Sequence, residues 1–356
     1  YISQEKKRMV RYITNSKKEE AMISKKELVL RAFRGEEVDR VPVGFWFHFV
    51  SQEEKMLGLD NPVIFNKSVE GHAAYVRAAR PDFVKIMSDG FFKYPSALYS
   101  DHIESIRDLA AIQSIGKHHP WIEQQIEMVK AVKASYPEDL ASFYNIFAPV
   151  SYLKRWFRRE GSRGDREIAD FLAENPELTG QVLDVIAGDI AILTRRIIEE
   201  AGTEGIYLST QQIQDGRVDA TSYRRYIEPS TVKVLEAANA AGGQNILHIC
   251  GFEGASNDLE LFKDYPAQVF NWATHHEGVS LAEGSKLFGG QTVLGGFENG
   301  RAALLNTGSR AELEAETKQL LAETGSQGVI LGADCTVPDD FEIERLDWIR
   351  QAASQF

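Results

Sequence analysis

The chain has 356 residues, of which 43% are hydrophobic and 26% charged, and its formal net charge is −12. This composition is typical of a globular protein with a large core, and it argues against disorder. The acidic balance predicts poor non-specific binding to nucleic acid or an anionic membrane, because both need a basic surface, although it does not exclude a local basic pocket. No apolar run reaches the roughly 18 residues of a transmembrane helix.

The first residues differ from the rest of the chain. Residues 1–23 are predicted to form a polar leader, partly helical or loosely ordered, and residues 24–356 to form one domain. The leader lacks the apolar segment of a secretory signal, so we expect a cytoplasmic protein.

From Ser24 onward, short β-rich runs alternate with longer amphipathic stretches. The candidate strands are 41–48, 82–88, 140–148, 205–210, 245–250, 267–273, 292–297 and 328–334. The clearest helix is 309–324, where Ser309 and Glu312 form a capping box and Gly325 follows as a C-terminal cap. Eight strands, nearly all followed by a helix, predict an α/β fold, a single (β/α)₈ TIM-type barrel. An open doubly wound sheet has the same rhythm and is the alternative, although no glycine-rich phosphate loop follows the first strand.

The reactive residues of a barrel gather where its strands end. Asp89 follows an apolar run, so we expect its pKa to be raised and its carboxyl group to orient or protonate a substrate. A loop carboxylate is the alternative for Asp89. Four further strand-end residues are predicted to bind substrate, namely His48, Gln211, Asn271 and Glu298. The basic cluster 154–159 is interpreted as a solvated helix face, with a role in holding an acidic substrate as the alternative.

Both cysteines of the chain lie at predicted strand ends. His248 and Cys250 are two residues apart on one strand, so their side chains share a face, and Cys335 at the last strand can converge on them. One imidazole and two thiolates suit Zn²⁺ and leave the fourth position for water or substrate. Glu298 is a candidate for that position. The alternative is that both cysteines are inert buried residues.

Several segments resemble the uroporphyrinogen decarboxylase family. Residues 31–42 (RAFRGEEVDRVP) resemble its start, and LHICG (247–251) and GGFEN (295–299) resemble later segments. IMSDGFFKYPSAL (86–98) and FAPVSYL (147–153) resemble the segments with its catalytic aspartate and active-site tyrosine, which implies catalytic roles for Asp89 and Tyr152. The resemblance spans about 24–356 and implies a distorted (β/α)₈ barrel that often forms homodimers.

The chain also departs from the decarboxylases of this family. Their substrate-binding arginines follow the first strand, whereas FWFHFVSQEEK (45–55) contains no arginine, and Cys335 lies near the place of their late histidine. The His-x-Cys…Cys set resembles the zinc methyltransferase branch, which moves methyl groups between methylated corrinoid proteins and thiols such as coenzyme M. This resemblance implies one zinc per chain on His248, Cys250 and Cys335. It also implies a small thiol or methylated substrate and a corrinoid carried by a partner protein.

The sequence therefore predicts a zinc-dependent, methyltransferase-like enzyme of this family. One alternative is a uroporphyrinogen-type decarboxylase that uses Asp89 without metal on a tetrapyrrole or a smaller acid. Another is a non-catalytic barrel that binds a corrinoid or a thiol.

Overall fold

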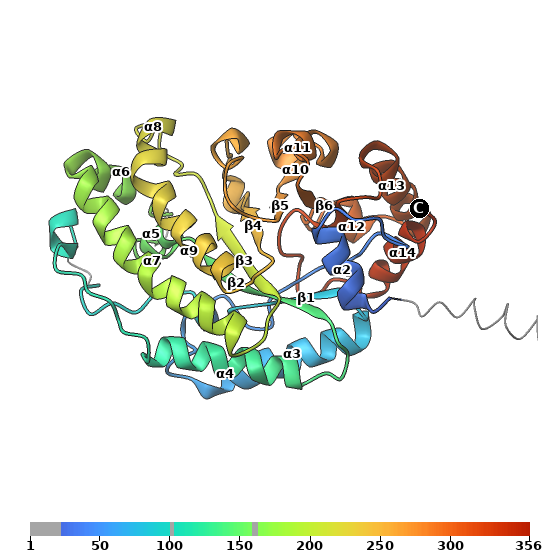
Figure 1. Ribbon diagram of the computed structural model, residues 1–356, viewed down its shortest axis with the longest axis horizontal. Coiled ribbons are helices and arrows are strands. Elements are labelled where there is room, and N and C mark those ends of the chain that lie inside the picture. Colours follow the sequence, from blue (N-terminus) through green and yellow to red (C-terminus); the bar gives the residue numbers. More distant parts are fainter. Residues whose placement is uncertain (1–22, 100–102, 159–162) are drawn as a thin grey trace, which may run out of the picture.

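One parallel sheet forms the centre of the computed structural model, which describes residues 23–99, 103–158 and 163–356 (Figure 1). Within these ranges the strands pair in chain order from β1 to β7, and every pair is parallel. The strands are β1 (Phe83–Ile86), β2 (Ala141–Phe147), β3 (Gly205–Thr210), β4 (Ile246–Ile249), β5 (Val269–Trp272), β6 (Thr292–Phe297) and β7 (Val329–Ala333). The predicted ranges of β3 and β6 are reproduced residue for residue.

The first predicted strand, 41–48, is the exception, because it makes only an isolated parallel bridge between Val43 and Leu331. Gly44 N–H donates to the Leu331 carbonyl at 3.0 Å, and Asp82 N–H donates to the Val43 carbonyl at 3.1 Å. The segment therefore lies between β7 and β1 and fills the eighth position of a TIM-type barrel. Pro42 has no N–H to donate to a regular ladder, which helps to explain why the prediction of a full strand was wrong.

An ion pair fixes this eighth segment to the start of β1. Two guanidinium nitrogens of Arg40 each donate to one carboxylate oxygen of buried Asp82 at 2.6 Å. Val43 N–H donates to the same carboxylate at 2.8 Å. The pair therefore supplies hydrogen bonds at the place where the backbone ladder is incomplete.

The strand side chains alternate between two cores, as the period of two requires. Phe83, Phe143 and Tyr207 point into the barrel and belong to an inner cluster. Val84 and Tyr144, their neighbours along β1 and β2, belong to the larger cluster between sheet and helices. All residues of the seven strands are buried, which explains why these runs are apolar almost throughout.

The helices surround the curled sheet, with α3 and α4 on one side and α13 and α14 on another (Figure 1). None of the helices that the structure describes is both long and apolar enough to cross a membrane. They are α2 (Lys25–Phe33), α3 (Pro62–Ala79), α4 (Pro120–Ala134), α5 (Pro149–Trp156), α6 (Asp165–Glu174), α7 (Pro176–Glu199), α8 (Ala220–Ser222), α9 (Glu228–Ala240), α10 (Thr274–Glu277), α11 (Leu281–Leu287), α12 (Leu304–Thr307), α13 (Arg310–Thr324) and α14 (Glu344–Ala353).

Helix α13 confirms the helix predicted at 309–324. Ser309 is its N-cap and forms the expected capping box with Glu312, and Gly325 follows with φ of 85°. Leu313, Thr317 and Leu321 are buried along one face.

Helix α2 closes the end of the barrel at which the strands begin. Phe33 stacks on Phe143 with 4.8 Å between the ring centroids, and Thr292 Oγ1 donates to the Ala32 carbonyl at 2.7 Å. Because this end is plugged, access to the interior is left to the opposite end. The predicted leader lies almost wholly at residues 1–22, outside the described ranges.

Candidate metal centre

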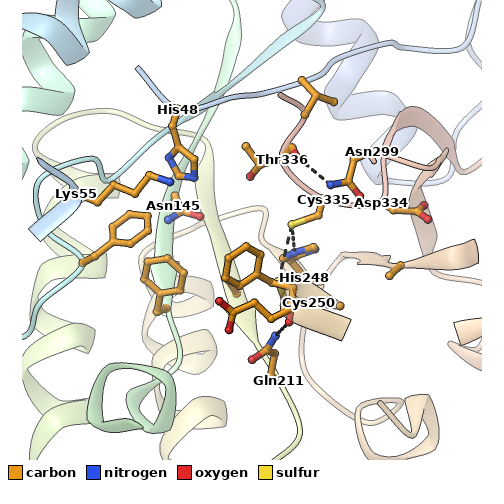
Figure 2. Close-up of a pocket in the computed structure, with 18 of the residues that line it drawn as sticks. His48, Lys55, Asn145, Gln211, His248, Cys250, Asn299, Asp334, Cys335 and Thr336 are labelled. Carbon is orange, nitrogen blue, oxygen red and sulfur yellow. Dashed lines mark hydrogen bonds between the residues drawn. The ribbon is translucent and has the colours of Figure 1, made fainter. Parts of the chain in front are cut away.

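A cavity of about 1290 Å³ lies at the end of the barrel where the strands finish (Figure 2). It is lined by residues at the ends of β3, β4, β6 and β7, by the chain from His48 to Met56, and by basic side chains of α5. This volume exceeds the roughly 300–1000 Å³ of ordinary small-molecule pockets. The position agrees with the active-site end of TIM-type barrels.

The two cysteines and His248 converge in this cavity, as their predicted positions require. Cys250 Sγ lies 3.8 Å from Cys335 Sγ, and Cys335 Sγ lies 3.6 Å from His248 Nε2. The ligand atoms of all three residues lie within 4.8 Å of one another. Residues 248 and 250 reach the same side because they are two positions apart at the end of β4, and Cys335 follows β7.

The separations suit a tetrahedral zinc ion. Zinc binds sulfur at about 2.3 Å and nitrogen at about 2.0–2.1 Å, so tetrahedral ligands lie about 3.8 Å apart for two sulfurs and about 3.6 Å apart for sulfur and nitrogen. The observed distances are 3.8 Å and 3.6 Å. The donor set and its spacing therefore fit zinc with one coordination position left open.

Asn271 on β5 fixes the orientation of the His248 ring. Asn271 Oδ1 accepts a hydrogen bond from His248 Nδ1 and another, at 2.6 Å, from the Tyr207 hydroxyl. The Asn271 amide nitrogen donates to the Leu294 carbonyl at 2.8 Å, which identifies Oδ1 as the acceptor. His248 therefore donates through Nδ1, and its Nε2 faces Cys335. Asn271 is fully buried beneath His248 and does not line the cavity, where the sequence placed it as a substrate-binding residue.

The two thiols differ in acidity because they contact each other. The hydrogen bond from Cys250, together with His248, holds the pKa of Cys335 well below its usual value, against the effect of burial. The same contact, together with burial, raises the pKa of Cys250 well above its usual value.

Asp89 lies behind His48 instead of facing the cavity. It is fully buried, and its carboxylate accepts hydrogen bonds from His48 Nδ1 at 2.7 Å and from Phe49 N–H at 2.9 Å. Burial alone would raise the pKa of Asp89, but these hydrogen bonds, with that of His48 as the larger, hold it below its usual value. The expected upward shift was therefore wrong. His48 lines the cavity, and its Nε2 is the ring nitrogen not used by Asp89.

The other predicted site residues separate into two groups. Gln211 and Glu298 line the cavity, where Gln211 accepts a hydrogen bond from Lys154 Nζ at 3.0 Å. Among the described residues, Glu298 is not a member of the ligand cluster, so the structure does not support it as the fourth ligand. Tyr152 does not line the cavity, because it is buried on α5 against the rings of Trp121 and other aromatic residues.

Sequence reasoning missed three basic residues of the cavity. Lys85 lies on β1 inside the barrel, with its ammonium 3.7 Å from the Tyr207 ring centroid, and burial lowers its pKa to about 8. The sequence did contain a signal for Lys85, because a lysine within an otherwise apolar strand is unusual. Lys55 and Arg155 also line the cavity. The interpretation of 154–159 as a solvated helix face was wrong for its described part, since Lys154 is buried there.

Comparisons with known proteins agree with this architecture. The family model for uroporphyrinogen decarboxylase (URO-D) matches residues 94–356. No curated protein matches the chain.

Two solved structures share the fold at low sequence identity. A methyltransferase from Methanosarcina mazei is similar with a TM-score of 0.69 and 16% identity, over 94% of this chain and 99% of that chain. A B12-independent methionine synthase from Shewanella sp. W3-18-1, in complex with selenomethionine, has a TM-score of 0.52 and 11% identity, over 89% of this chain and 97% of that chain. At these identities the likeness concerns the fold alone.

Proposed function

The chain belongs to the uroporphyrinogen decarboxylase family, and from that premise we propose that it is a zinc-dependent methyltransferase acting between a methylated donor and a thiol. The observation that carries the proposal is the triad of His248, Cys250 and Cys335, whose ligand atoms lie within 4.8 Å of one another and in which the two Cys335 separations match edges of a zinc tetrahedron. The names of the two similar structures, a methyltransferase and a methionine synthase, agree with methyl transfer. A methylated corrinoid on a partner protein is the proposed donor.

Each residue of the triad has a defined part in this proposal. His248 offers the lone pair of Nε2, and Cys250 and Cys335 offer two thiolates, which cancel the charge of a divalent ion. The ion, when bound, would supply a Lewis acid that keeps a substrate thiol deprotonated near neutral pH. Asn271 holds the His248 ring in the tautomer that metal binding requires.

His48 is the proposed group for proton transfer. Its Nδ1 is held by Asp89, so Nε2 is free to accept the proton that a thiol loses inside the cavity. Asp89 acts through His48 as a positioning residue, because its carboxylate is covered by His48 and Phe49. This arrangement gives the cavity that holds the triad a base on its wall.

The test is zinc uptake followed by methyl transfer. Wild type, Cys335→Ala and His276→Ala are purified, stripped, given zinc and measured by elemental analysis, then assayed with methylcobalamin and small thiols. His276 is the control because it lines the cavity but does not belong to the ligand cluster. Wild type and His276→Ala should bind about one zinc per chain. Cys335→Ala should lose more affinity than the 10–100-fold of an outer-shell change, and its stability should change little.

Equal zinc uptake by wild type and Cys335→Ala would show that the cysteines are ordinary core residues, and the proposal would fail. Zinc uptake without methyl transfer would favour a barrel that only binds a thiol or a corrinoid.

A decarboxylase is the second candidate, because family membership and the basic side chains of the cavity both favour an acidic substrate. Arg155 of α5 places an arginine at the cavity that the segment 45–55 does not provide. This candidate needs no metal. Activity that survives complete removal of zinc, with release of carbon dioxide from an acid, would distinguish it from methyl transfer.

A further inference from the structure

The basic side chains of the cavity fall into two sets. Seven lysine and arginine residues line it, and four of them form ion pairs with carboxylates: Lys154, Arg158, Arg163 and Arg301. Lys55, Lys85 and Arg155 form no ion pair within the described part of the chain. A buried charge without a counter-charge is costly, and this chain has an excess of acidic residues with which it could have paired them.

Two of the three unpaired cations converge on one aromatic ring. The Arg155 guanidinium carbon lies 5.0 Å from the centroid of Phe92 and 3.8 Å from that of Phe147. The Lys55 ammonium lies 5.9 Å from the Phe92 centroid. Lys55 comes from the helical turn Glu54–Met56 and Arg155 from α5, so two separate elements bring like charges together.

Neither Lys55 nor Arg155 forms an ion pair within the described part of the chain. Lys55 is 7% exposed, and among the described residues its ammonium donates only to the neutral side chain of Gln52, at 3.0 Å. Arg155 Nε is buried and has no hydrogen-bond partner in the structure. Burial lowers the pKa of Lys55 to about 8. The carboxylate of Asp89 opposes this shift, and the charge of Arg155 adds to it. An anion between them would remove the repulsion and satisfy the open donors.

We propose that Lys55 and Arg155 form an anion pole, which binds a carboxylate, sulfonate or phosphate group of the substrate while the reacting end of the substrate lies at the triad. The proposal rests on the proposed function, since one substrate is to span both places. Figure 2 shows Lys55 beside His48 and across the cavity from Cys250 and Cys335. The forked guanidinium of Arg155 matches two oxygens of such a group.

Lys85 does not belong to the anion pole. Its ammonium lies over the ring of Tyr207, whose centroid is 5.3 Å from that of His248, so it lies at the metal end of the cavity. An anionic substrate would therefore place its charged tail at the pole and its sulfur nearer the triad and Lys85. A neutral thiol of the same length would differ from the anionic substrate only in lacking the contacts at the anion pole.

The first experiment measures anion binding independently of zinc and of turnover. Propionate, ethanesulfonate and ethyl phosphate are titrated into the full-length protein, with and without zinc, by calorimetry, and propanamide serves as the neutral control. Wild type should bind at least one of the anions and not propanamide. Lys55→Gln and Arg155→Gln should each weaken binding about 10–100-fold, the loss expected for one charge-assisted hydrogen bond.

The matched control is Arg301→Gln, because Arg301 lines the same cavity but is already paired with Asp340 at 2.6 Å. It should bind the anions as wild type does, and circular dichroism should show all three variants folded. Unchanged affinity in folded Lys55→Gln and Arg155→Gln would overturn the anion pole, as would an equal loss in Arg301→Gln. The relative affinities of the three anions identify the acidic group that the anion pole binds best.

A second experiment separates this proposal from the proposed function. Zinc-loaded wild type and Arg155→Gln are compared with 3-sulfanylpropionate and 2-sulfanylethanol as methyl acceptors. If the anion pole binds the substrate, Arg155→Gln should raise the KM for 3-sulfanylpropionate about 10–100-fold and leave the KM for 2-sulfanylethanol unchanged, with kcat retained. Equal KM values for both thiols in both proteins would refute the pole and leave methyl transfer standing. Anion binding without any methyl transfer would support the pole and refute the proposed function.

Discussion

Replacing Asn271 by leucine tests whether the tautomer of His248 controls metal binding. The leucine keeps much of the volume of asparagine but removes the oxygen that accepts from His248 Nδ1 and from the Tyr207 hydroxyl. Both donors are buried and would lose their partner. The free energy of unfolding should therefore fall by about 1–3 kcal/mol for each of the two groups.

The effect on zinc follows from the same lost contact. Without Asn271 the His248 ring is free to rotate and to place its proton on either nitrogen, and loss of such an outer-shell partner costs about 10–100-fold in metal affinity. That range equals about 1.4–2.7 kcal/mol of binding free energy. Zinc affinity is measured at pH 7 by competition with a chelator, and stability by denaturant unfolding of the same samples.

Asn299→Leu is the matched control. Asn299 lines the cavity and, like Asn271, donates to a backbone carbonyl, that of Thr336 at 2.9 Å, but among the described residues it forms no hydrogen bond with His248. It should bind zinc as wild type does. If folded Asn271→Leu also binds zinc as wild type does, then the tautomer argument is refuted. A raised KM with unchanged zinc affinity would instead support the substrate-binding role that the sequence suggested for Asn271.

Three further predictions concern the fold and the reaction. Asp82→Asn should lower the free energy of unfolding by about 3 kcal/mol in denaturant titrations, because Arg40 loses its buried partner. Burial lowers the pKa of His72 to about 4, so between pH 6.5 and pH 4 the unfolded state binds more protons than the folded state. The contribution of His72 to the free energy of unfolding is thus complete above pH 6.5 and falls by about 2 kcal/mol at pH 5. Denaturant unfolding of wild type and His72→Gln at pH 7 and at pH 5 measures this loss. Finally, the absence of arginine from 45–55 predicts negligible decarboxylation of uroporphyrinogen, and coproporphyrinogen formed by the pure protein at enzyme-like rates would contradict this.

The strands were predictable because their signal is local. A strand buried on both faces must be apolar over its whole length, and seven such runs became strands within two residues of the predicted ends. The helix α13 was likewise encoded in its own capping residues. The segment 41–48 carries the same apolar signal, but its pairing depends on Leu331 and Asp82, which are far away in the sequence.

The convergence of the candidate metal ligands was predictable because strand ends meet at one rim of a barrel. The position of His248, Cys250 and Cys335 at such ends was enough to predict their convergence, and their distances confirm it. Asn271 was found by the same rule, but its contact with His248 required the register of β4 and β5.

The rest of the cavity was decided by tertiary packing. Position in the sequence does not say which side of a short helix faces a cavity, so only the structure shows that Arg155 lines the cavity and that Tyr152, three residues earlier on α5, does not. In the same way, only the fold shows that His48 covers Asp89 and reverses the expected shift of its pKa. The physical reason is that local sequence determines the apolar pattern and the end of each element, whereas the angle at which the elements pack determines where their polar side chains point.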